Sequence, residues 1–205
     1  MNTENKIYFY PLWLRIWHGI NALGIIILII TGITMNSGME DSWISFNLNI
    51  QLHNYTGAFV TLNYFLFVIG NLVTSNSKFY IIKPRNFLKR PLKQAYYYVW
   101  GMFHGMEAPY PLSEKRKFNP LQKYSYLAVM YIVVPLVIIS GIGLMFPELI
   151  FNQIYNVSGV LITAVTHSAM GFFISIFLVI HLYVASIGKS PLDNFRSMIN
   201  GWHHI

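Results

Sequence analysis

The sequence predicts an all-α membrane protein, in which a bundle of four transmembrane helices forms a single domain over residues 1–205. Two compositional observations predict this class: 55% of the residues are hydrophobic and only 10% are charged. Soluble domains carry about 25% charged residues. The third observation is the presence of four long apolar stretches. A helix of roughly 20 residues crosses a hydrocarbon core about 30 Å thick, so each stretch is long enough to span it.

The four predicted spans are taken in chain order. Their approximate bounds are Leu12–Met35, Leu52–Thr74, Gln122–Phe146 and Val160–Ile187. The first span lies where a signal peptide would lie. Its apolar stretch is longer than a typical signal core, and no small-residue cleavage site follows it. We therefore expect the first span to be retained as a transmembrane helix.

The distribution of basic residues predicts how the bundle is oriented. All fourteen Lys and Arg residues fall on one side of the four spans, and the two segments on the other side, Asn36–Gln51 and Pro147–Gly159, contain none. Loops rich in Lys and Arg stay in the cytoplasm, so both termini are expected there. This topology accounts for the net charge of +7, and we expect no nucleic-acid partner.

The connection between the second and third spans, Ser75–Leu121, is long and lies on the basic side. Within it, the segment Arg85–Gly105 mixes Lys and Arg with Leu, Tyr, Trp and Phe. That composition is typical of an amphipathic segment at a membrane surface. A solvated loop is the alternative interpretation.

The chain has no cysteine, which excludes disulfides, iron–sulfur clusters and covalently attached c-type haem on this chain. Seven histidines are present, and four of them fall within the predicted spans: His18, His53, His167 and His181. Ionisable residues are rare in membrane helices and are functional candidates there. For any one histidine alone, a neutral ring that hydrogen-bonds a neighbouring helix is an equally good interpretation.

The depths of these four histidines favour a functional role. Because successive spans run in opposite directions, His18 and His181 lie near the cytoplasmic side, and His53 and His167 lie near the other side. The fourteen residues from His167 to His181 rise about 21 Å along a helix and return to within roughly 40° of the same face. A haem iron takes axial ligands on both faces of the ring. The pattern therefore predicts an outer haem held by His53 and His167, and an inner haem held by His18 and His181. Bis-histidine ligation leaves no open iron position, which favours electron transfer over oxygen chemistry.

Other residues near the two histidine levels have weaker assignments. Gly57 and Gly171 each lie one turn after a histidine, where a small residue leaves room for a ring; ordinary helix packing explains them equally. Arg15 lies one turn before His18 and is either a partner of a haem propionate or a topology anchor. Three further histidines, His104, His203 and His204, have no matching depth and are not expected to bind haem.

The four-histidine pattern, with the segments AYYYVWGMFHGMEAPYP and KFNPLQKYSYLAVMYIVVPLVIISGIGLMFP, resembles the prokaryotic di-haem cytochrome b subunits over nearly the whole chain. These are the membrane subunits of thiosulfate reductase, formate dehydrogenase and nickel–iron hydrogenase, and the first of these is the most similar. The resemblance implies two haems b, ligated by the same four histidines, in a multi-pass protein of the prokaryotic cytoplasmic (inner) membrane.

The resemblance also implies a quinone site near the inner haem, for menaquinone or ubiquinone. In similar subunits an N-x-x-Q-K turn opens the third helix beside that site, and this chain has Asn119, Gln122 and Lys123 at those positions. Their polar groups are expected to bind a quinone carbonyl and to help relay protons. Alternatively, Asn119 caps the helix and Pro120 occupies its first position. Both roles are compatible.

We expect the chain to be an electron-transfer subunit surrounded by membrane lipid, with no catalytic residues of its own. The chain ends soon after the fourth span, so another protein is expected to exchange electrons with it, and the resemblance implies an extracytoplasmic subunit with molybdopterin, iron–sulfur clusters or c-type haems. Two alternatives remain open: a stand-alone superoxide–quinone oxidoreductase, and a non-redox membrane anchor or transporter. The first needs a cationic path for its anion, which the outer segments lack. The second leaves the histidine pattern unexplained.

Overall fold

The computed structural model describes residues 6–37, 44–82, 87–111, 113, 116–188 and 190–204, and the chain is mostly helical there. Four helices are long and apolar enough to cross a membrane. They are α1 (Leu12–Ser37), α2 (Phe46–Val73), a third helix over Pro120–Met145, and α6 (Gly159–Ala185). These four helices confirm the predicted fold class.

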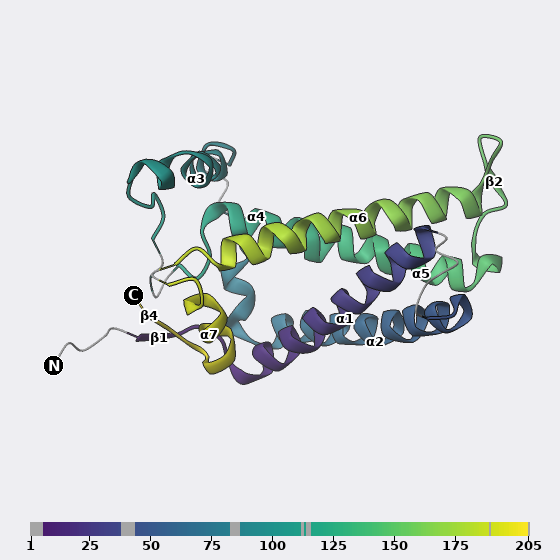
Figure 1. Cartoon of the computed structure of the whole chain (residues 1–205), viewed down its shortest axis with the longest axis horizontal. Helices are drawn as coiled ribbons and strands as arrows, with labels where there is room; N and C mark the ends of the chain where they lie inside the picture. Colours follow the sequence, from purple (N-terminus) through teal and green to yellow (C-terminus); the bar gives the residue numbers. More distant parts are fainter. Residues whose placement is uncertain are drawn as a thin grey trace.

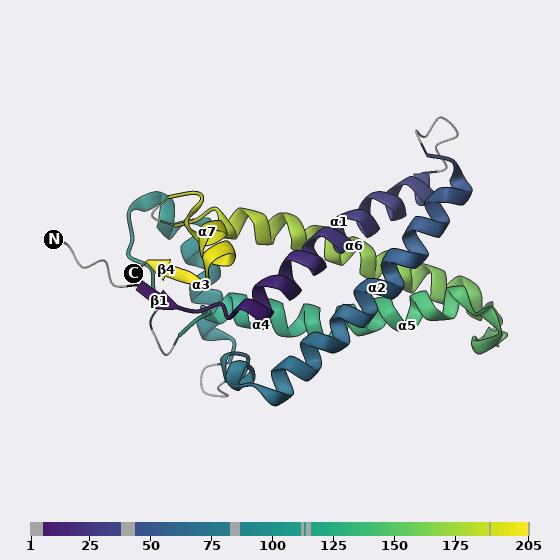
Figure 2. The same cartoon turned by 90° about the horizontal axis from the view of Figure 1, so that it is seen from below.

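The long helices form two hairpins, as Figures 1 and 2 show. In one, α1 packs along α2; in the other, α6 packs along the third helix. Helix α1 begins and α6 ends at the same end of the bundle (Figure 1). We call it the basic end, because the Lys and Arg residues of the sequence flank the spans on that side. The opposite end is called the far end. Which end faces the cytoplasm stays a prediction.

Helix α2 begins six residues before the predicted Leu52. Ser45 caps it, because the Ser45 hydroxyl accepts a hydrogen bond from the backbone N–H of Leu48 at 3.4 Å. Two asparagines in the first turns interrupt the apolar pattern, so the start of α2 could not be predicted from the sequence. One of them, Asn49, is only 2% exposed and donates its side-chain amide to the carbonyl of Thr31 at 3.1 Å.

The third helix is continuous but changes its winding. It consists of α4 (Pro120–Ala128), a π-helical turn η3 (Val129–Val133) and α5 (Val134–Met145). Pro135 has no backbone N–H, so the helix cannot keep its regular hydrogen bonds one turn earlier, and wider turns absorb such a defect. The hydroxyl of Tyr64 on α2 donates to the carbonyl of Met130 at 3.0 Å and thereby links the two hairpins.

Shorter elements gather at the two ends of the bundle. At the basic end lie η1 (Ser75–Phe79), α3 (Lys89–Val99), η2 (Gly101–His104) and α7 (Asp193–Asn200). Strands β1 (Lys6–Tyr8) and β4 (Trp202–His204) pair there in an antiparallel register. At the far end, η4 (Pro147–Leu149) precedes a hairpin of β2 (Gln153–Ile154) and β3 (Val157–Ser158), whose turn places Tyr155 and Asn156 at positive φ. These strand pairings could not be predicted from the sequence, because strands of two or three residues are too short to show an alternating apolar pattern.

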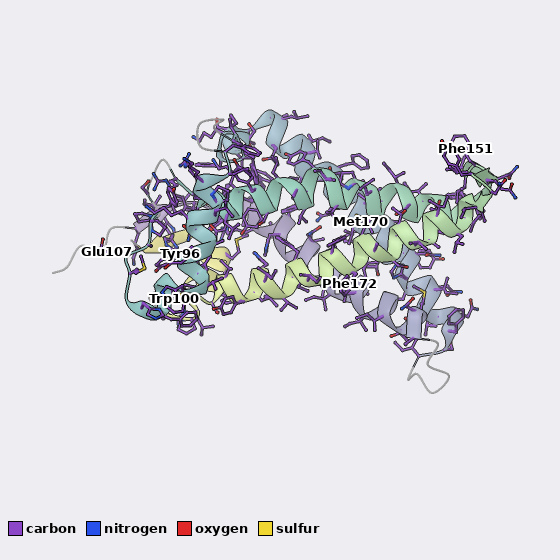
Figure 3. The ribbon with its side chains drawn as sticks, turned by 90° about the horizontal axis from the view of Figure 1, so that it is seen from above. Tyr96, Trp100, Glu107, Phe151, Met170 and Phe172 are labelled. Atoms are coloured by element: carbon purple, nitrogen blue, oxygen red, sulfur yellow. The ribbon has the colours of Figure 1, made fainter. Side chains whose placement is uncertain are left out.

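Helix α3 falls within the segment predicted to be amphipathic; residues 85 and 86 of that segment lie outside the described residues. Apolar side chains of α3 are exposed: the exposed fraction is 66% for Leu92 and 76% for Val99. Figure 3 places Tyr96 and Trp100 at the basic end, and Phe151 at the opposite end of the bundle. Contact of α3 with a lipid surface stays a prediction.

Candidate functional site

The four histidines of the spans meet in two pairs, each formed across the two hairpins. At the basic end, the ring centres of His18 on α1 and His181 on α6 are 6.1 Å apart. Toward the far end, the ring centres of His53 on α2 and His167 on α6 are also 6.1 Å apart. These are the pairs that their depths predict. We call them the inner pair and the outer pair.

The separation of 6.1 Å has a chemical meaning. A metal–imidazole bond is about 2 Å long and a ring nitrogen lies about 1 Å from the ring centre, so two imidazoles on opposite sides of one metal ion have centres about 6 Å apart. Both pairs have this separation. Side chains on α6 contribute to both pairs, fourteen residues apart, which corresponds to a rise of about 21 Å.

The hydrogen bond of His53 determines which of its ring nitrogens carries the proton. Thr31 is 3% exposed, and its hydroxyl donates to the carbonyl of Ile27 at 2.8 Å. The same hydroxyl lies 2.8 Å from Nδ1 of His53. Because the hydroxyl hydrogen is already used, Nδ1 is the donor in this contact. The lone pair is then on Nε2, where a metal ion binds a neutral imidazole.

The same reasoning applies to His167 on the other side of the outer pair. Its Nδ1 lies 3.1 Å from the carbonyl of Val137 and 3.1 Å from the hydroxyl of Ser140. A carbonyl only accepts hydrogen bonds, and the Ser140 hydroxyl donates to Leu136 at 2.6 Å, so Nδ1 of His167 also carries the proton. Metal-binding histidines commonly hold their second nitrogen in this way.

Glycines make room for the outer rings, although not only the ones that the sequence predicts. A Cβ added at Gly141 on α5 would lie 3.0 Å from Cε1 of His167, and one at Gly32 on α1 would lie 3.6 Å from Cε1 of His53. Sequence reasoning overlooked Gly141, since it precedes its histidine by 26 residues. Of the two predicted glycines, Gly171 has no atom within 4 Å of an added Cβ, whereas Gly57 contacts Leu28 at 3.8 Å.

Aromatic rings surround the inner pair. Phe177 stacks on His181, with ring centres 5.7 Å apart and planes 14° apart. Tyr126 on α4 approaches the same histidine at 6.1 Å, and Trp17 approaches His18 at 6.5 Å. The inner pair is therefore set among ring faces, while the outer pair is set among hydroxyl and carbonyl oxygens.

Arg15 lies one helical turn from the inner pair. Its guanidinium Nη1 donates to the backbone carbonyl of Ile199 on α7, which holds the C-terminal helix against α1. Its Nε is buried, and within the described residues it has no hydrogen-bond partner. A buried guanidinium donor without a partner is the group that an anionic substituent, such as a carboxylate, satisfies.

The predicted quinone residues begin α4 and cap it. The Asn119 side-chain oxygen accepts from the backbone N–H of Gln122 at 2.9 Å, and the Gln122 side-chain oxygen accepts from the backbone N–H of Asn119 at 3.1 Å. This capping box, with Pro120 at the first position, realises the structural alternative given above. Lys123 donates to the carbonyl of Ile81 at 3.1 Å. A role of these residues toward a quinone stays a prediction.

Asn119 also ties α4 to α3. Its amide nitrogen donates to the hydroxyl of Tyr98 at 2.8 Å, and Asn119 is 5% exposed. Burial raises the pKa of Tyr98, so its hydroxyl stays neutral at physiological pH. The capping residue thus ties α3 to the start of α4 through this hydrogen bond.

The remaining described histidines lie apart from the two pairs. His104 stacks on Trp100 with ring centres 4.0 Å apart, and Nδ1 of His203 lies 3.2 Å from the Ser197 hydroxyl. Among the described residues, no cluster of three or more His, Cys, Asp or Glu side chains is present. Two histidines facing each other without a third such ligand suit haem iron, because the porphyrin supplies the other four ligands.

Comparisons with known proteins place nearly the whole chain in a family. The family model described as prokaryotic cytochrome b561 matches residues 9–201 of the chain. The Escherichia coli (strain K12) protein named "Putative cytochrome YdhU" is 32% identical over 198 residues, which cover 97% of this chain and 75% of that protein.

The capping box leads to a prediction about stability. Asn119→Ala removes the acceptor for the Gln122 N–H and the donor to Tyr98; losing an N-cap costs about 1 kcal/mol, and a lost hydrogen bond costs about as much again. Asn119→Ser keeps the capping oxygen and loses only the Tyr98 contact. We expect the Ala variant to unfold at a lower temperature in detergent than the Ser variant. Equal unfolding temperatures would contradict a capping role.

Proposed function

The chain belongs to the prokaryotic cytochrome b561 family, and from this premise we propose that it holds two b-type haems and relays electrons between a membrane quinone and a redox subunit at the far end. Members of the family bind haem b and transfer electrons within the membrane. With four helices that are long and apolar enough to span, the chain is a multi-pass protein of the inner membrane. The number of haems, the quinone and the partner are the proposed parts.

One observation carries the proposal of two haems. The inner and outer pairs have the same separation of 6.1 Å between ring centres, and each joins α6 to the other hairpin. Their separation along α6, about 21 Å, is large enough for two cofactors, one above the other. A single haem would leave the second matched pair without a role.

The residues of each pair position and tune the haem that they would hold. When bound, a haem would supply an iron that changes between the ferric and ferrous states, and the two histidines of each pair would hold it. Thr31 and Ser140 keep Nε2 of His53 and His167 unprotonated, and they restrain the two rings in place. At the inner pair, the unpartnered Nε of Arg15 is available to a haem propionate.

We place the quinone at the basic end, near the start of α4, and menaquinone and ubiquinone both fit the chemistry. The capping box occupies the side-chain oxygens of Asn119 and Gln122, but the Gln122 amide nitrogen remains a donor suited to a quinone carbonyl. The Lys123 ammonium, bound to the carbonyl of Ile81, lies one position further along the same turn.

The partner in this proposal is an extracytoplasmic subunit with molybdopterin, iron–sulfur clusters or c-type haems. The basic end is then cytoplasmic, as the positive-inside rule predicts. At the far end, Phe151 is 77% exposed and Tyr155 is 97% exposed (Figure 3 labels Phe151). In this proposal these aromatic side chains belong to the docking surface, since aromatic residues are enriched at protein interfaces.

The first experiment is a reduced-minus-oxidised spectrum with haem quantification on the purified protein. We expect two haems b per chain in the wild type, loss of one in His53→Ala, and loss of the other in His181→Ala. His104→Ala, which removes a histidine outside both pairs, is the matched control and should retain both. Haem that persists in both pair variants would overturn the proposed ligation.

The acceptor of the His53 Nδ1–H provides a second prediction. Thr31→Val keeps the shape of the side chain but removes the acceptor, and losing such a contact typically weakens metal binding 10–100-fold. We expect the outer haem alone to be lost more readily on dilution. Ser140→Ala should have a smaller effect, because the Val137 carbonyl still accepts from His167. Thr34→Val, whose hydroxyl bonds only to its own helix, is the control.

The quinone site is tested by quinol-dependent haem reduction in membranes. Gln122→Glu keeps the capping oxygen and removes the amide donor, so the helix start is preserved. Losing one hydrogen bond to the quinone is expected to slow reduction about tenfold, while reduction by dithionite stays complete. Lys93→Met on α3 is the control. An unchanged quinol rate in Gln122→Glu would exclude this residue from the site.

A further inference from the structure

A buried lysine lies at the basic end, outside all the roles assigned above. Lys117 precedes the capping box of α4 and is only 2% exposed. The sequence gives it no distinction from the other basic residues of this side. Lys side chains are almost never fully buried unless they are paired with an acid, so the surroundings of Lys117 need an explanation.

Aromatic rings and one amide surround the Lys117 ammonium. Its Nζ lies 4.6 Å from the ring centre of Tyr10, and 5.4 Å from those of Phe79 and Phe118. It donates to the side-chain oxygen of Asn76 at 3.4 Å. These are cation–π contacts and one long hydrogen bond, without a carboxylate among the described residues.

The described titratable groups around Lys117 are three tyrosines and one exposed lysine, which supply no negative charge. Tyr10 precedes α1, and burial raises its pKa to about 12. Tyr80 follows η1, and burial raises its pKa as well. Tyr126 on α4 lies behind Phe118, and Lys78 on η1 is exposed on the Phe79 ring at 5.1 Å. The charge on Lys117 is therefore uncompensated, and burial lowers its pKa to about 8.

Two chains of aromatic contacts join this cage to the inner pair. On one side, Phe118 contacts Tyr126 at 5.1 Å, and Tyr126 contacts His181 at 6.1 Å. The second chain of ring contacts runs from Phe118 through Tyr80, Phe67 and Trp17 to His18. Ring faces screen charge poorly compared with water, so a charge at either end is felt at the other.

We propose that Lys117 is the proton acceptor that responds to reduction at the inner pair. This inference rests on the proposed function, because it requires an inner haem. With a haem held by the inner pair, an electron supplied by a quinol would add one negative charge there, and one proton from water would convert the neutral Lys117 amine to an ammonium. The added negative charge and the added positive charge cancel, which makes each event favour the other.

The sign of the pH dependence follows from this coupling. Below about pH 8, Lys117 is protonated in both redox states, so the inner midpoint potential is high and flat. Above that pH the oxidised protein loses the proton, whereas the reduced protein keeps it up to a higher pH. Reduction then takes up a proton, and the inner potential falls as pH rises. The outer pair, about 21 Å further along α6, responds far less.

The test is a potentiometric titration of both haems at several pH values between 6 and 10 (a range around the Lys117 pKa of about 8) in four proteins. The wild type should show an inner potential that falls above about pH 8. In Lys117→Met the inner midpoint potential should be low and should not change with pH, because the ammonium charge is absent. Lys117→Arg should have a high, flat one, because a guanidinium keeps its proton. Lys78→Met, which removes the exposed lysine on the same Phe79 ring, should behave as the wild type.

The outcomes separate this inference from the proposed function. Two haems with an inner slope that persists in both Lys117 variants would overturn the role of Lys117 and leave the two-haem proposal intact. Absence of an inner haem in the wild type would overturn both. If Lys117→Met does not fold, Lys117→Arg decides alone: a high potential without the slope supports the inference, and a retained slope contradicts it.

Discussion

The rest of the structure depends on one constraint, which is that a polar atom inside a membrane must find its partner inside the protein. Trp17 and Asn63 satisfy it reciprocally, since the Trp17 indole donates to the Asn63 carbonyl and the Asn63 amide donates to the Trp17 carbonyl. The Tyr64 hydroxyl satisfies a carbonyl in the π turn of the other hairpin. Such contacts fix the rotation of each helix, and helix rotation decides where the histidines point.

The same constraint selects the form of the outer histidines. In hydrocarbon, an imidazole N–H needs an acceptor, and the nearest hydroxyls on α1 and α5 provide it. Satisfying Nδ1 leaves Nε2 as the bare nitrogen on both rings. Thr31 and Ser140 thus each satisfy a buried N–H, and in the proposed function the same hydrogen bonds would also tune the haem.

The sequence predicted what depends on local pattern and missed what depends on distant neighbours. Long apolar runs identify four spans, and the depth of a histidine within a span follows from counting residues, so the two pairs were predictable. The start of α2 was not, because Asn49 is polar by itself and is buried only through its contact with α1. In the sequence, Lys117 likewise looks like one of the basic residues that set the membrane orientation. Its cage comes from Tyr10 and Phe79, which are far away in the chain.

The surroundings of the outer pair and of the inner pair differ in whether they contain groups that gain or lose protons near neutral pH. The partners of the outer pair are hydroxyl and carbonyl oxygens, which do not titrate near neutral pH, so an electron there changes no protonation equilibrium among those partners. The inner pair contacts Tyr126, and ring contacts through Tyr126 and Phe118 lead from it to Lys117, whose pKa burial lowers to about 8. A quinone exchanges protons as well as electrons, whereas transfer between two haems needs electrons alone. In the proposed function, titratable groups would therefore be useful near the quinone and would slow electron transfer between the two haems, because each electron would have to wait for a proton.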